Sequence, residues 1–425
     1  MSLAFEPNQG ARMEIKNVYV VGAGFMGNGI AQMAALAGYK VTMSDVGADR
    51  LEAGIDEIRS SLGKFRGKQK ITGEQYDAAL ENLTTTTELD DARDADLVVE
   101  AVPEVLALKK EVFARLDEMC SSDAILATNT SAISISSIAS AASRPERVVG
   151  THFFGPVPVM RLCEIIGGLL TSKETVEKAD AWARSLGKET VLVRKDHAGF
   201  IANRVTVPGS LEAVRLVDEG MATPGEIDRV ATFGADSGIG PMMIMDNAGI
   251  DVSFRTAMAI YDDTGDPRFF PPPLMRRMVD ANLLGRKTGK GFYDYSTGQR
   301  AGYELAGVRA CPGEVEDECE RDARSGTIMR RILIPIMLEA VRMVEAGVAV
   351  PEDIDRASRL GFNFPSGPLE LADGMGLDDV LASAAAIYED TGNRNYFPPP
   401  SLRRMVKDGL LGRKSGRGFY EYSQE

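Results

Sequence analysis

Asn17-Val18-Tyr19-Val20-Val21 runs directly into Gly22-Ala23-Gly24-Phe25-Met26-Gly27, and an apolar stretch then continues to Leu36 before Gly38. A β-branched run, a glycine-rich turn and helically spaced apolar residues predict a strand, a tight turn and a helix. The first glycine makes the turn, the second lets the backbone approach an anion, and the third lets helix and strand pack closely. Because a helix N-terminus attracts negative charge, we expect the pyrophosphate of a dinucleotide to bind here.

A second strand is predicted over residues 40–44, and it leads directly into Asp45. Asp45 follows Gly27 at the spacing typical of dinucleotide sites, where an acidic residue stands roughly 20 residues beyond the glycines. A carboxylate at this place accepts hydrogen bonds from an adenosine ribose and repels a 2′-phosphate. No arginine follows Asp45 immediately. The sequence therefore predicts NAD rather than NADP.

Further strands are predicted over residues 96–100 and 124–128, with a helix from about Val105 to Cys120 between them. This alternation indicates a mostly parallel, doubly wound α/β sheet of the Rossmann type. Ligands bind at the carboxyl ends of the strands in such sheets, so we expect Ala101, Glu104 and Asn129-Thr130-Ser131 beside the cofactor. The last segment also fits a plain strand-to-helix turn with Ser131 as the cap.

His152 is one of two histidines in the chain, and it lies in Thr151-His152-Phe153-Phe154-Gly155-Pro156 on the next expected strand. Imidazole takes and returns a proton near neutral pH, so a histidine-poor chain has few places for acid–base chemistry. Glu164 follows His152 at the end of another apolar run. The pair predicts a base and its orienting carboxylate; the competing interpretation is a buried histidine bonded to backbone.

From Pro208 onward the chain repeats itself without a gap, at the constant offset that carries Pro208 onto Pro335. Glu212-Ala213-Val214-Arg215 recurs as Glu339-Ala340-Val341-Arg342, and Gly291-Phe292-Tyr293 recurs as Gly418-Phe419-Tyr420. Apolar residues at helical spacing and Pro/Gly punctuation predict two tandem all-α domains of the same fold. Asn203 has Arg330 as its counterpart, so a catalytic asparagine there would belong to the first copy alone.

We divide the chain into a nucleotide-binding domain at residues 14–197, a first helical domain at 198–297, a linker at 298–325 and a second helical domain at 326–425. The linker is polar and acidic and is expected to become helical near Val315. The second copy has no nucleotide-binding domain of its own. We therefore expect it to serve packing.

The chain contains 44% hydrophobic and 26% charged residues and has a net charge of −14 at pH 7. This acidic balance argues against nucleic acid or an anionic membrane as a partner.

No apolar run reaches the roughly 20 residues that a spanning helix needs, and residues 1–13 lack the pattern of a signal peptide. We expect a soluble, cytoplasmic protein with no metal site, a loose leader over residues 1–13, and four reduced thiols at Cys120, Cys163, Cys311 and Cys319.

Lys64-Phe65-Arg66-Gly67-Lys68-Gln69-Lys70 is a basic cluster in this acidic chain, directly after a helix expected from Arg50 to Leu62. Such a cluster could meet an anionic part of a substrate, or it could be a solvated run of charge.

Together these segments closely resemble the L-3-hydroxyacyl-CoA dehydrogenases. The resemblance is carried by Gly22 through Gly27, Thr128 through Ser131, His152 through Met160, Gly199 through Arg204 and Gly289 through Tyr293, and it covers essentially the chain from Ile15 on. The chain looks most like the longer members with a duplicated helical domain, such as the dehydrogenase part of fatty-oxidation multifunctional enzymes. The resemblance implies reversible, NAD-dependent oxidation of an L-3-hydroxyacyl-CoA to a 3-oxoacyl-CoA, in β-oxidation or related acyl-CoA metabolism.

The resemblance also implies roles for individual residues. His152 is similar to the family's general base, Glu164 to its orienting acid, and Ser131 and Asn203 to the groups that hold the substrate carbonyl and hydroxyl. The expected NAD contacts are Gly22, Ala23, Gly24, Phe25, Met26, Gly27, Asp45, Ala101, Glu104, Lys109, Ser131, Gly155 and Lys287, with Lys414 in the place of Lys287 in the second copy. The expected CoA contacts are Ser61, Lys68, Lys109 and Ser131, and the phosphates of coenzyme A would give the basic cluster its partner.

Two positions depart from the family pattern. The family usually has asparagine where this chain has Gly155, which removes an amide expected near the nicotinamide ribose. The family often has proline before Gly199-Phe200, where this chain has Asp196-His197-Ala198. We expect His197 to be an exposed hinge residue.

Two other functions remain open on these residues. One is a dehydrogenase of a free hydroxy acid or sugar acid, similar to the gulonate-type relatives of this family. The other is a non-catalytic NAD-binding protein, for which Gly155 is the best support. The duplication suggests a monomer in which the second copy takes the place of a partner subunit's domain, and a homodimer is the alternative.

Overall fold

A computed structural model describes residues 15–232, 239–303 and 318–423, with the side chains of residues 318–321 left out. The chain forms two compact units, Met1–Phe200 and Ile201–Glu425. Within the described ranges, none of the helices combines the length and apolar character that crossing a membrane requires. The predicted leader over residues 1–13, the predicted helix start near Val315 and the predicted thiols of Cys311 and Cys319 lie outside what is described.

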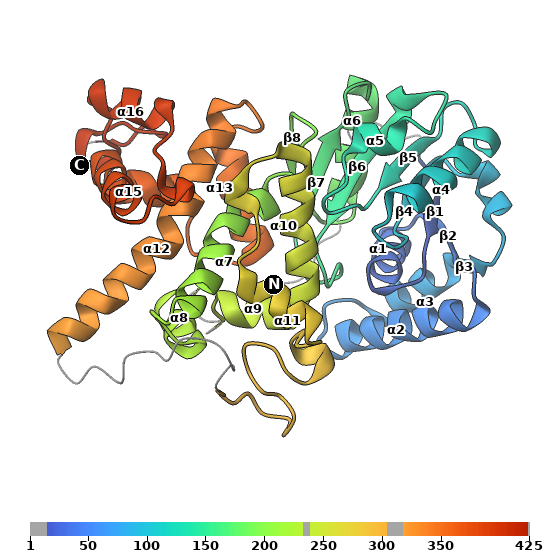
Figure 1. Cartoon of the computed structure of the whole chain (residues 1–425). Coiled ribbons are helices and arrows are strands. Elements are labelled where there is room, and N and C mark those ends of the chain that lie inside the picture. The colour runs from blue at the N-terminus through green and yellow to red at the C-terminus, as the bar shows by residue number, and fades with distance from the viewer. Residues whose placement is uncertain (1–14, 233–238, 304–317, 424–425) are drawn as a thin grey trace. The chain divides into compact units, whose positions relative to one another are not determined.

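One eight-stranded sheet forms the centre of the first unit (Figure 1), in the order β3-β2-β1-β4-β5-β6-β7-β8. The strands are β1 (Asn17–Val21), β2 (Lys40–Ser44), β3 (Leu83–Thr86), β4 (Leu97–Glu100), β5 (Ile125–Thr128), β6 (Val148–Phe153), β7 (Leu162–Gly167) and β8 (Glu189–Val193). Strands β1 to β6 are parallel, whereas β7 is antiparallel to β6 and parallel to β8. The predicted mostly parallel α/β sheet is confirmed, with a reversed pair of strands at one edge.

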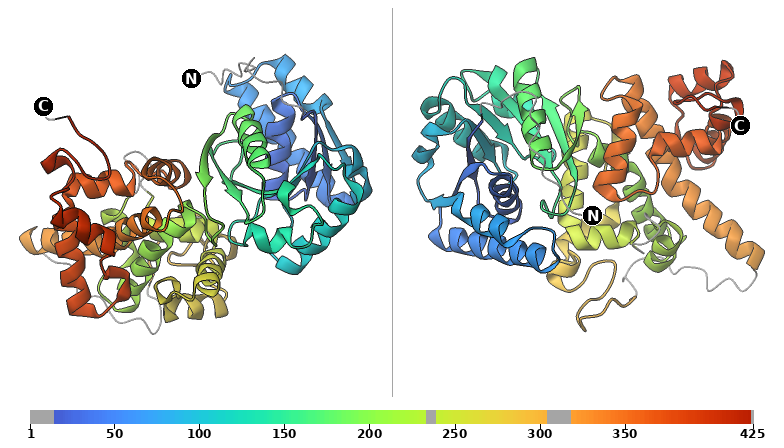
Figure 2. Two further views of the ribbon diagram at one scale, coloured as in Figure 1. Left: turned by 90° about the horizontal axis from the view of Figure 1, so that it is seen from above. Right: turned by 180° about the vertical axis from the view of Figure 1, so that it is seen from behind.

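Helices cover both faces of this sheet (Figures 1 and 2). They are α1 (Phe25–Leu36), α2 (Ala48–Gly67), α3 (Gly73–Glu81), α4 (Leu106–Met119), α5 (Ile135–Ala139) and α6 (Lys173–Ser185). Ile30 of α1 and Trp182 of α6 share one buried apolar cluster with alternate strand residues such as Val18. Phe113 and Leu116 of α4 are buried outside that cluster. Because strand side chains alternate between faces, the central strands are apolar on both sides.

Helix α2 is longer than the sequence pattern indicates. We expected it to end near Leu62, with the basic cluster following it, but it continues to Gly67. Phe65 is buried on the apolar face of the helix. Lys64 and Arg66 therefore stand on the last turn, where positive side chains are favourable to the helix dipole. The prediction erred because glycine at position 63 and the charges after it resembled a helix end.

The second unit consists of two helical copies, which confirms the predicted tandem fold. The first contains α7 (Ala202–Asp218), α8 (Pro224–Val230), α9 (Pro241–Ala248), α10 (Ile250–Thr264) and α11 (Pro273–Asp280). The second contains α12 (Glu318–Glu345), α13 (Pro351–Phe362), α14 (Pro368–Met375), α15 (Leu377–Thr391) and α16 (Pro400–Lys407). Short 3-10 turns follow the same pattern, namely η3 (Pro267–Phe269) and η4 (Arg286–Thr288) in the first copy and η5 (Arg394–Tyr396) and η6 (Arg413–Ser415) in the second.

Residues 304–317 of the predicted linker at 298–325 lie outside the described residues, and the residues before them contact the first copy. Ala301 exchanges two backbone hydrogen bonds of 2.9 Å with Asp294, and the hydroxyl of Tyr303 donates to the carbonyl of Gly291. These residues therefore belong to the first copy. The predicted start of the second domain at residue 326 falls inside α12, which begins at Glu318.

Each copy is organised around buried aspartates. Asp228 accepts hydrogen bonds from two N–H groups at the start of α9 and from the hydroxyl of Tyr293 at 2.7 Å. Asp355 repeats all three bonds in the second copy, with Tyr420 at 2.8 Å. Asp246 likewise accepts from the N–H groups of the Gly-Phe-Tyr turn. The repeated Gly-Phe-Tyr motif is thus explained by the internal hydrogen bonds of each copy.

The long helices α7 and α12 pack against each other and carry reciprocal ion pairs. Nε of Arg204 donates to Oε1 of Glu339 at 3.0 Å, and Nε of Arg331 donates to Oε1 of Glu212 at 2.5 Å. The offset of the repeat carries Arg204 onto Arg331 and Glu212 onto Glu339, so the two ion pairs are equivalent. All four side chains are buried. The two copies therefore meet as the two halves of a symmetric interface do.

Candidate active site

The glycine-rich turn has the form that a dinucleotide requires. Gly22 has φ +108°, and a Cβ added there would lie 2.8 Å from the carbonyl oxygen of Ala101. A Cβ at Gly27 would run into the carbonyl of Gly22, so strand and helix pack closely only with glycine there. A Cβ on Gly24 would have nothing within 4 Å, which leaves open space over the turn.

The N-terminus of α1 is also suited to an anion. Its capping residue is Gly24, no side chain caps the helix, and its first turn carries no acidic residue. The backbone N–H groups of this turn are therefore available to phosphate oxygens, as the cofactor needs. Phe25, in the first turn, is 64% exposed.

Asp45 lies at the carboxyl end of β2, beside this turn. Its Oδ2 accepts from the backbone N–H of Ala23 at 3.0 Å, and its Oδ1 is 3.7 Å from Arg50. The N–H bond fixes the carboxylate against the glycine turn. The residues present at the turn and at Asp45 therefore fit a dinucleotide of the NAD type.

His152 and Glu164 form a buried pair on neighbouring strands. Nδ1 of His152 lies 2.6 Å from Oε2 of Glu164, and Glu164 is 0% exposed. His152 lies at the end of β6, so it reaches the same edge of the sheet as the ends of β1, β4 and β5. The structure thus brings the two predicted catalytic residues together and places them at the ligand-binding edge of the sheet.

Two aromatic rings flank the imidazole of His152. The ring centroids of Phe154 and Phe200 lie 4.5 Å and 5.6 Å from that of His152. The backbone N–H of Phe153 donates to Oδ1 of Asn129 at 2.9 Å. The apolar walls restrict water around the pair, and Asn129 joins the end of β6 to the turn after β5.

Glu104 organises the turn that carries Ser131. Its Oε1 accepts from the hydroxyl of Thr130 at 2.5 Å and from the N–H groups of Ser131 at 2.9 Å and Ala132 at 3.1 Å. Burial raises the pKa of Glu104, but the charge of Lys109 and the hydrogen bonds from Thr130 and Ser131 outweigh it and lower the pKa below its usual range. Glu104 therefore acts on the shape of this turn.

Lys109 is 1% exposed, and its ammonium pairs with Glu100 at 2.7 Å and with Glu104 at 3.2 Å. A side chain so enclosed offers no surface to a ligand. The predicted contacts of Lys109 with the cofactor and with CoA stay predictions that this geometry does not favour. Its observed partners are the two carboxylates and the carbonyl of Val102 at 3.4 Å.

Gly155 lies close to the glycine-rich turn. A Cβ added to Gly155 would collide with the ring of Phe25 and would approach Sδ of Met26 to 3.3 Å. Phe25 therefore occupies part of the space that an asparagine side chain would need. The predicted cofactor contacts of Phe25, Met26 and Gly155 remain predictions.

The residues expected at CoA lie toward one end of α2. Ser61 is half-buried, and Lys68 is exposed at the C-terminal cap of the helix. About two helical turns separate them, so they lie on one face. Arg66 instead stacks on the ring of Tyr76 at 4.4 Å.

Three predicted site residues belong to the second unit. Asn203 lies in the first turn of α7, Lys287 pairs with Asp251, and Lys414 pairs with Asp378 and with Asp379 at 3.2 Å. Their predicted contacts with substrate or cofactor stay predictions.

Two predictions about turns and hinges were wrong. The cap of α5 is Ser134, which accepts from the N–H of Ser137, and not Ser131. Asp196 supports that cap by accepting from the hydroxyl of Ser134 at 2.7 Å. His197 is half-buried and has an interaction partner, so it is not an exposed hinge residue.

Sequence reasoning missed the buried carboxylate of Glu100, which accepts from Lys109 and from the hydroxyl of Thr128 at 2.7 Å. It ends strand β4, and its only signal was a charged residue in a run otherwise typical of a buried strand. The thiols of Cys120 and Cys163 are buried and unpaired with each other. Among the residues described, no group of three or more His, Cys, Asp or Glu side chains could hold a metal ion.

A nucleotide turn and a histidine held by a buried carboxylate, both at one edge of a parallel sheet, meet the needs of a nicotinamide-dependent dehydrogenase. Comparison with known families identifies which dehydrogenase family the chain matches. Residues 17–197 match the NAD binding domain of 3-hydroxyacyl-CoA dehydrogenase, and residues 199–295 and 326–422 each match its C-terminal domain. The chain belongs to the 3-hydroxyacyl-CoA dehydrogenase family and is an oxidoreductase that oxidises hydroxyacyl-CoA with NAD.

Similar proteins include both shorter and full-length relatives. A probable 3-hydroxybutyryl-CoA dehydrogenase of Bacillus subtilis is 42% identical over 283 residues, which cover 67% of this chain and 98% of that protein. A 3-hydroxyadipyl-CoA dehydrogenase of Escherichia coli is 32% identical, covering 93% of this chain and 98% of that protein. The crystal structure of an E. coli 3-hydroxybutyryl-CoA dehydrogenase aligns with TM-score 0.82 at 30% identity, covering 93% of this chain and 99% of that one.

Proposed function

We propose that His152 is the general base of the oxidation and that Glu164 is its orienting carboxylate. The observation that carries this proposal is the 2.6 Å contact between Nδ1 of His152 and Oε2 of Glu164 in a buried pair. An ionised carboxylate only accepts hydrogen bonds, so Nδ1 carries the ring hydrogen. Nε2 of the neutral ring then holds the lone pair that accepts a proton.

In the forward direction, Nε2 of His152 removes the proton of the substrate 3-hydroxyl. Glu164 stabilises the imidazolium that results, because the pair is already in contact and needs no rearrangement. NAD, when bound, supplies the acceptor for the hydride from the hydroxyl-bearing carbon. In the reverse direction His152 returns the proton to the substrate oxygen.

The proposed substrate is the CoA thioester of an L-3-hydroxy acid. Exposed Lys68 and half-buried Ser61, on one face of α2, suit the phosphates of coenzyme A. The names of the relatives include a short acyl group, 3-hydroxybutyryl, and a dicarboxylic one, 3-hydroxyadipyl. Both are therefore candidates, and a free hydroxy acid is the less favoured alternative.

The remaining predicted site residues keep supporting roles in this proposal. Ser131 and Asn203 are proposed to hold the substrate oxygens, and Lys287 to contact NAD. Lys109 is proposed as a positioning residue, because its ammonium pairs with Glu104 and Glu104 holds the turn at Ser131.

We further propose that the second helical copy replaces the domain of a partner subunit. The reciprocal pairs Arg204–Glu339 and Arg331–Glu212 support this, because they repeat as contacts do across a two-fold axis. The intact chain is then expected to be a monomer.

The test is NADH formation by the full chain with 3-hydroxybutyryl-CoA, 3-hydroxyadipyl-CoA and free 3-hydroxybutyrate. His152→Gln is expected to lower kcat by about 10²- to 10⁴-fold, while NADH binding measured by fluorescence changes little. His197→Gln, at the other histidine, is the matched control and should keep its activity. Equal loss of turnover and NADH binding in His152→Gln would assign His152 a structural role. Turnover of the free acid at the rate of the thioester would exclude the CoA assignment.

A further inference from the structure

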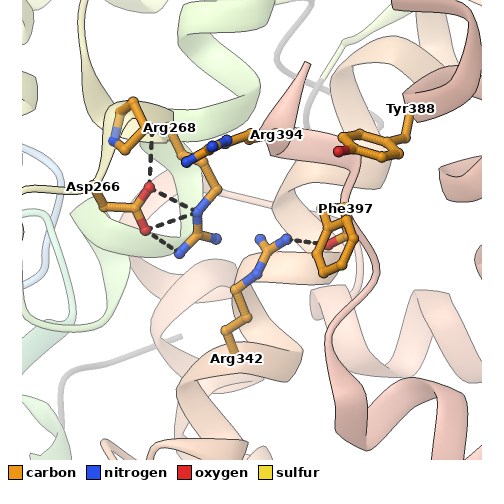
Figure 3. A pocket seen from close by; sticks show the side chains of 7 residues that line it. Asp266, Arg268, Arg342, Tyr388, Arg394 and Phe397 are labelled. Atoms are coloured by element: carbon orange, nitrogen blue, oxygen red, sulfur yellow. Dashed lines mark hydrogen bonds and ion pairs between the residues drawn. The ribbon is translucent and has the colours of Figure 1, made fainter. Parts of the chain in front are cut away.

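A cavity of about 450 Å³ opens where the two helical copies meet (Figure 3). We call it the seam cavity. The first copy lines it with Asp266, Pro267 and Arg268, and the second copy with Arg342, Tyr388, Arg394 and Phe397. These residues come from η3 and the residue before it, and from α12, α15, η5 and the residue after it. All of them belong to the second unit, and the oxidation proposed above uses none of them.

Positive charge exceeds negative charge around the seam cavity. Three arginines and one aspartate line it. Arg268 is held by Asp266 through two nitrogens and donates to Glu339 at 2.6 Å. Glu339 is fully buried and also accepts from Arg204 of α7. Two carboxylates thus face four guanidinium groups, counting Arg342 and Arg394, which leaves an excess of two positive charges.

Arg342 and Arg394 are the two guanidinium groups with the weakest anionic partners. Arg342 donates to the carbonyl of Phe397 at 2.7 Å and is 3.4 Å from Glu339. Burial, followed by the neighbouring charge of Arg268, lowers the pKa of Arg342 to about 10. The side chain of Arg394 is exposed and makes no hydrogen bond or ion pair with any residue that the structure describes. Figure 3 shows Arg268, Arg342 and Arg394 around the same space.

The excess of positive charge is larger at the seam cavity than at the equivalent place of the repeat. The offset of the repeat carries Asp266-Pro267-Arg268 onto Asn393-Arg394-Asn395. At the other place, Glu212 pairs with Arg331 and Arg215, and the counterpart of Arg268 is the neutral Asn395. Asn393, the counterpart of Asp266, donates its amide to Glu212 at 3.2 Å. The packing of two duplicated helices would produce the same charge on both sides. The additional arginines of the seam cavity need a different explanation.

We propose that the seam cavity binds a small dianionic ligand of the phosphomonoester class. Guanidinium groups present paired N–H donors that match phosphate oxygens, and a phosphate dianion balances two surplus positive charges. The cavity also has aromatic walls, since the rings of Tyr388 and Phe397 meet edge to face at 5.3 Å and Phe397 is 47% exposed. These walls give an apolar surface to the organic part of the ligand.

The experiment titrates inorganic phosphate into the full chain by calorimetry at constant ionic strength. Saturating NADH and coenzyme A are present, so that the phosphate sites of cofactor and substrate are occupied. Arg394→Ala is the test variant. It is expected to fold, because the side chain is exposed and the first copy has Pro267 at the equivalent position. Arg417→Ala is the matched control, because Arg417 is another exposed arginine of the second copy and pairs with Glu421. Succinate replaces phosphate in a parallel titration.

One saturable phosphate site is expected in the natural chain and in Arg417→Ala. Arg394→Ala should bind phosphate at least about tenfold more weakly, which corresponds to the loss of one charge-assisted hydrogen bond. Absence of saturable phosphate binding in the natural chain, or equal affinity in Arg394→Ala, overturns the proposal. Saturable binding of succinate without binding of phosphate overturns the assignment to the phosphate class.

Discussion

His152 and Glu164 are direct cross-strand partners in the antiparallel pair of β6 and β7. Side chains of such partners emerge on the same face of a sheet, about 5 Å apart at Cβ. The contact between Nδ1 and Oε2 is therefore fixed by backbone register and does not depend on a mobile loop. A slip of one residue in this register would move the partner of His152 to the other face.

Glu164→Gln should separate two effects of Glu164, namely its orientation of the His152 ring and its negative charge. The amide retains the size of the side chain but no longer stabilises an imidazolium, so we expect kcat to fall by about 10²-fold or more, with little change in NADH binding. Steady-state kinetics and NADH fluorescence check both quantities. Glu189→Gln, at a half-exposed carboxylate on β8, is the control. Unchanged kcat in Glu164→Gln would exclude the proposed role.

Glu104→Gln should loosen the turn that carries Ser131. A neutral amide loses the attraction of Lys109, and its oxygen accepts more weakly the four hydrogen bonds that the turn donates. We expect the KM for NAD to rise by roughly tenfold, because about 1.4 kcal/mol of charge-assisted bonding is lost. Glu111→Gln, exposed on α4, should leave KM unchanged. If Glu104→Gln and Glu111→Gln have the same KM for NAD, the hydrogen bonds of Glu104 to the turn do not affect cofactor binding.

Asp117 should make the stability of the first unit depend on pH. Burial alone would raise its pKa, but hydrogen bonds from Ser143 and the guanidinium of Arg147 lower it from 3.8 to about 2. An acid with a lowered pKa in the folded state stabilises the fold above its unfolded pKa, and this stability is lost as pH falls from about 4 to about 2. The contribution is about 2 kcal/mol.

Thermal unfolding between pH 6 and pH 2 tests this linkage with Asp117→Asn. The variant should melt below the natural chain at pH 6, and the difference in Tm should shrink toward pH 2. Asp123→Asn, an exposed residue after the same helix, is the control. A difference in Tm that stays constant over the whole range would contradict the assignment.

Glu339→Gln should destabilise the second unit strongly. It leaves Arg204, Arg268 and Arg342 near one another without the carboxylate that they share. Removing one partner of a buried ion pair typically costs about 3–5 kcal/mol. Urea unfolding followed by far-UV circular dichroism measures this loss. Glu345→Gln, which pairs with exposed Arg404, should cost less than about 1 kcal/mol. Similar losses in the two variants would mean that the interface between the copies contributes little.

Truncation after Tyr303, which keeps the residues bonded to the first copy, should convert the protein into a self-associating one. Without α12, the buried face of α7 and the side chains of Arg204 and Glu212 lose their partners. A second truncated chain offers an equivalent surface, so we expect a dimer. Sedimentation compares the intact and truncated chains. If the truncated chain is a well-folded monomer, the proposal that the second copy takes the place of a partner subunit's domain is wrong.

Much of the fold could be predicted because its signals are local. The turn from Gly22 to Gly27 and the strand that leads into Asp45 are read from residues adjacent in the sequence, and the constant offset of the repeat reveals the duplication directly. The pairing of His152 with Glu164 was also predicted, from a rare histidine followed by a carboxylate in the next apolar run. Glu164 lies within that run and not at its end. What connects them, a strand reversal that sets the register, became visible only in the structure.

The remainder depends on burial, which composition does not reveal. Charged residues are read as surface, yet Glu100 and Lys109 are buried and pair with each other. Ser134 and not Ser131 caps α5 because Asp196, distant in sequence, binds at that helix start. The arginines of the seam cavity come from both copies. The sequence does not show how the copies pack, so it does not place Arg268 beside Arg342.

The buried aspartates Asp228 and Asp355 have a consequence for how this chain can evolve. Each accepts hydrogen bonds from residues of its own copy alone. In a homodimer every substitution at the interface appears twice, once on each side of the axis. In a fused chain it appears once. The difference between Asp266-Pro267-Arg268 and Asn393-Arg394-Asn395 is one-sided in this way, and a homodimer, whose two sides carry one sequence, does not allow it.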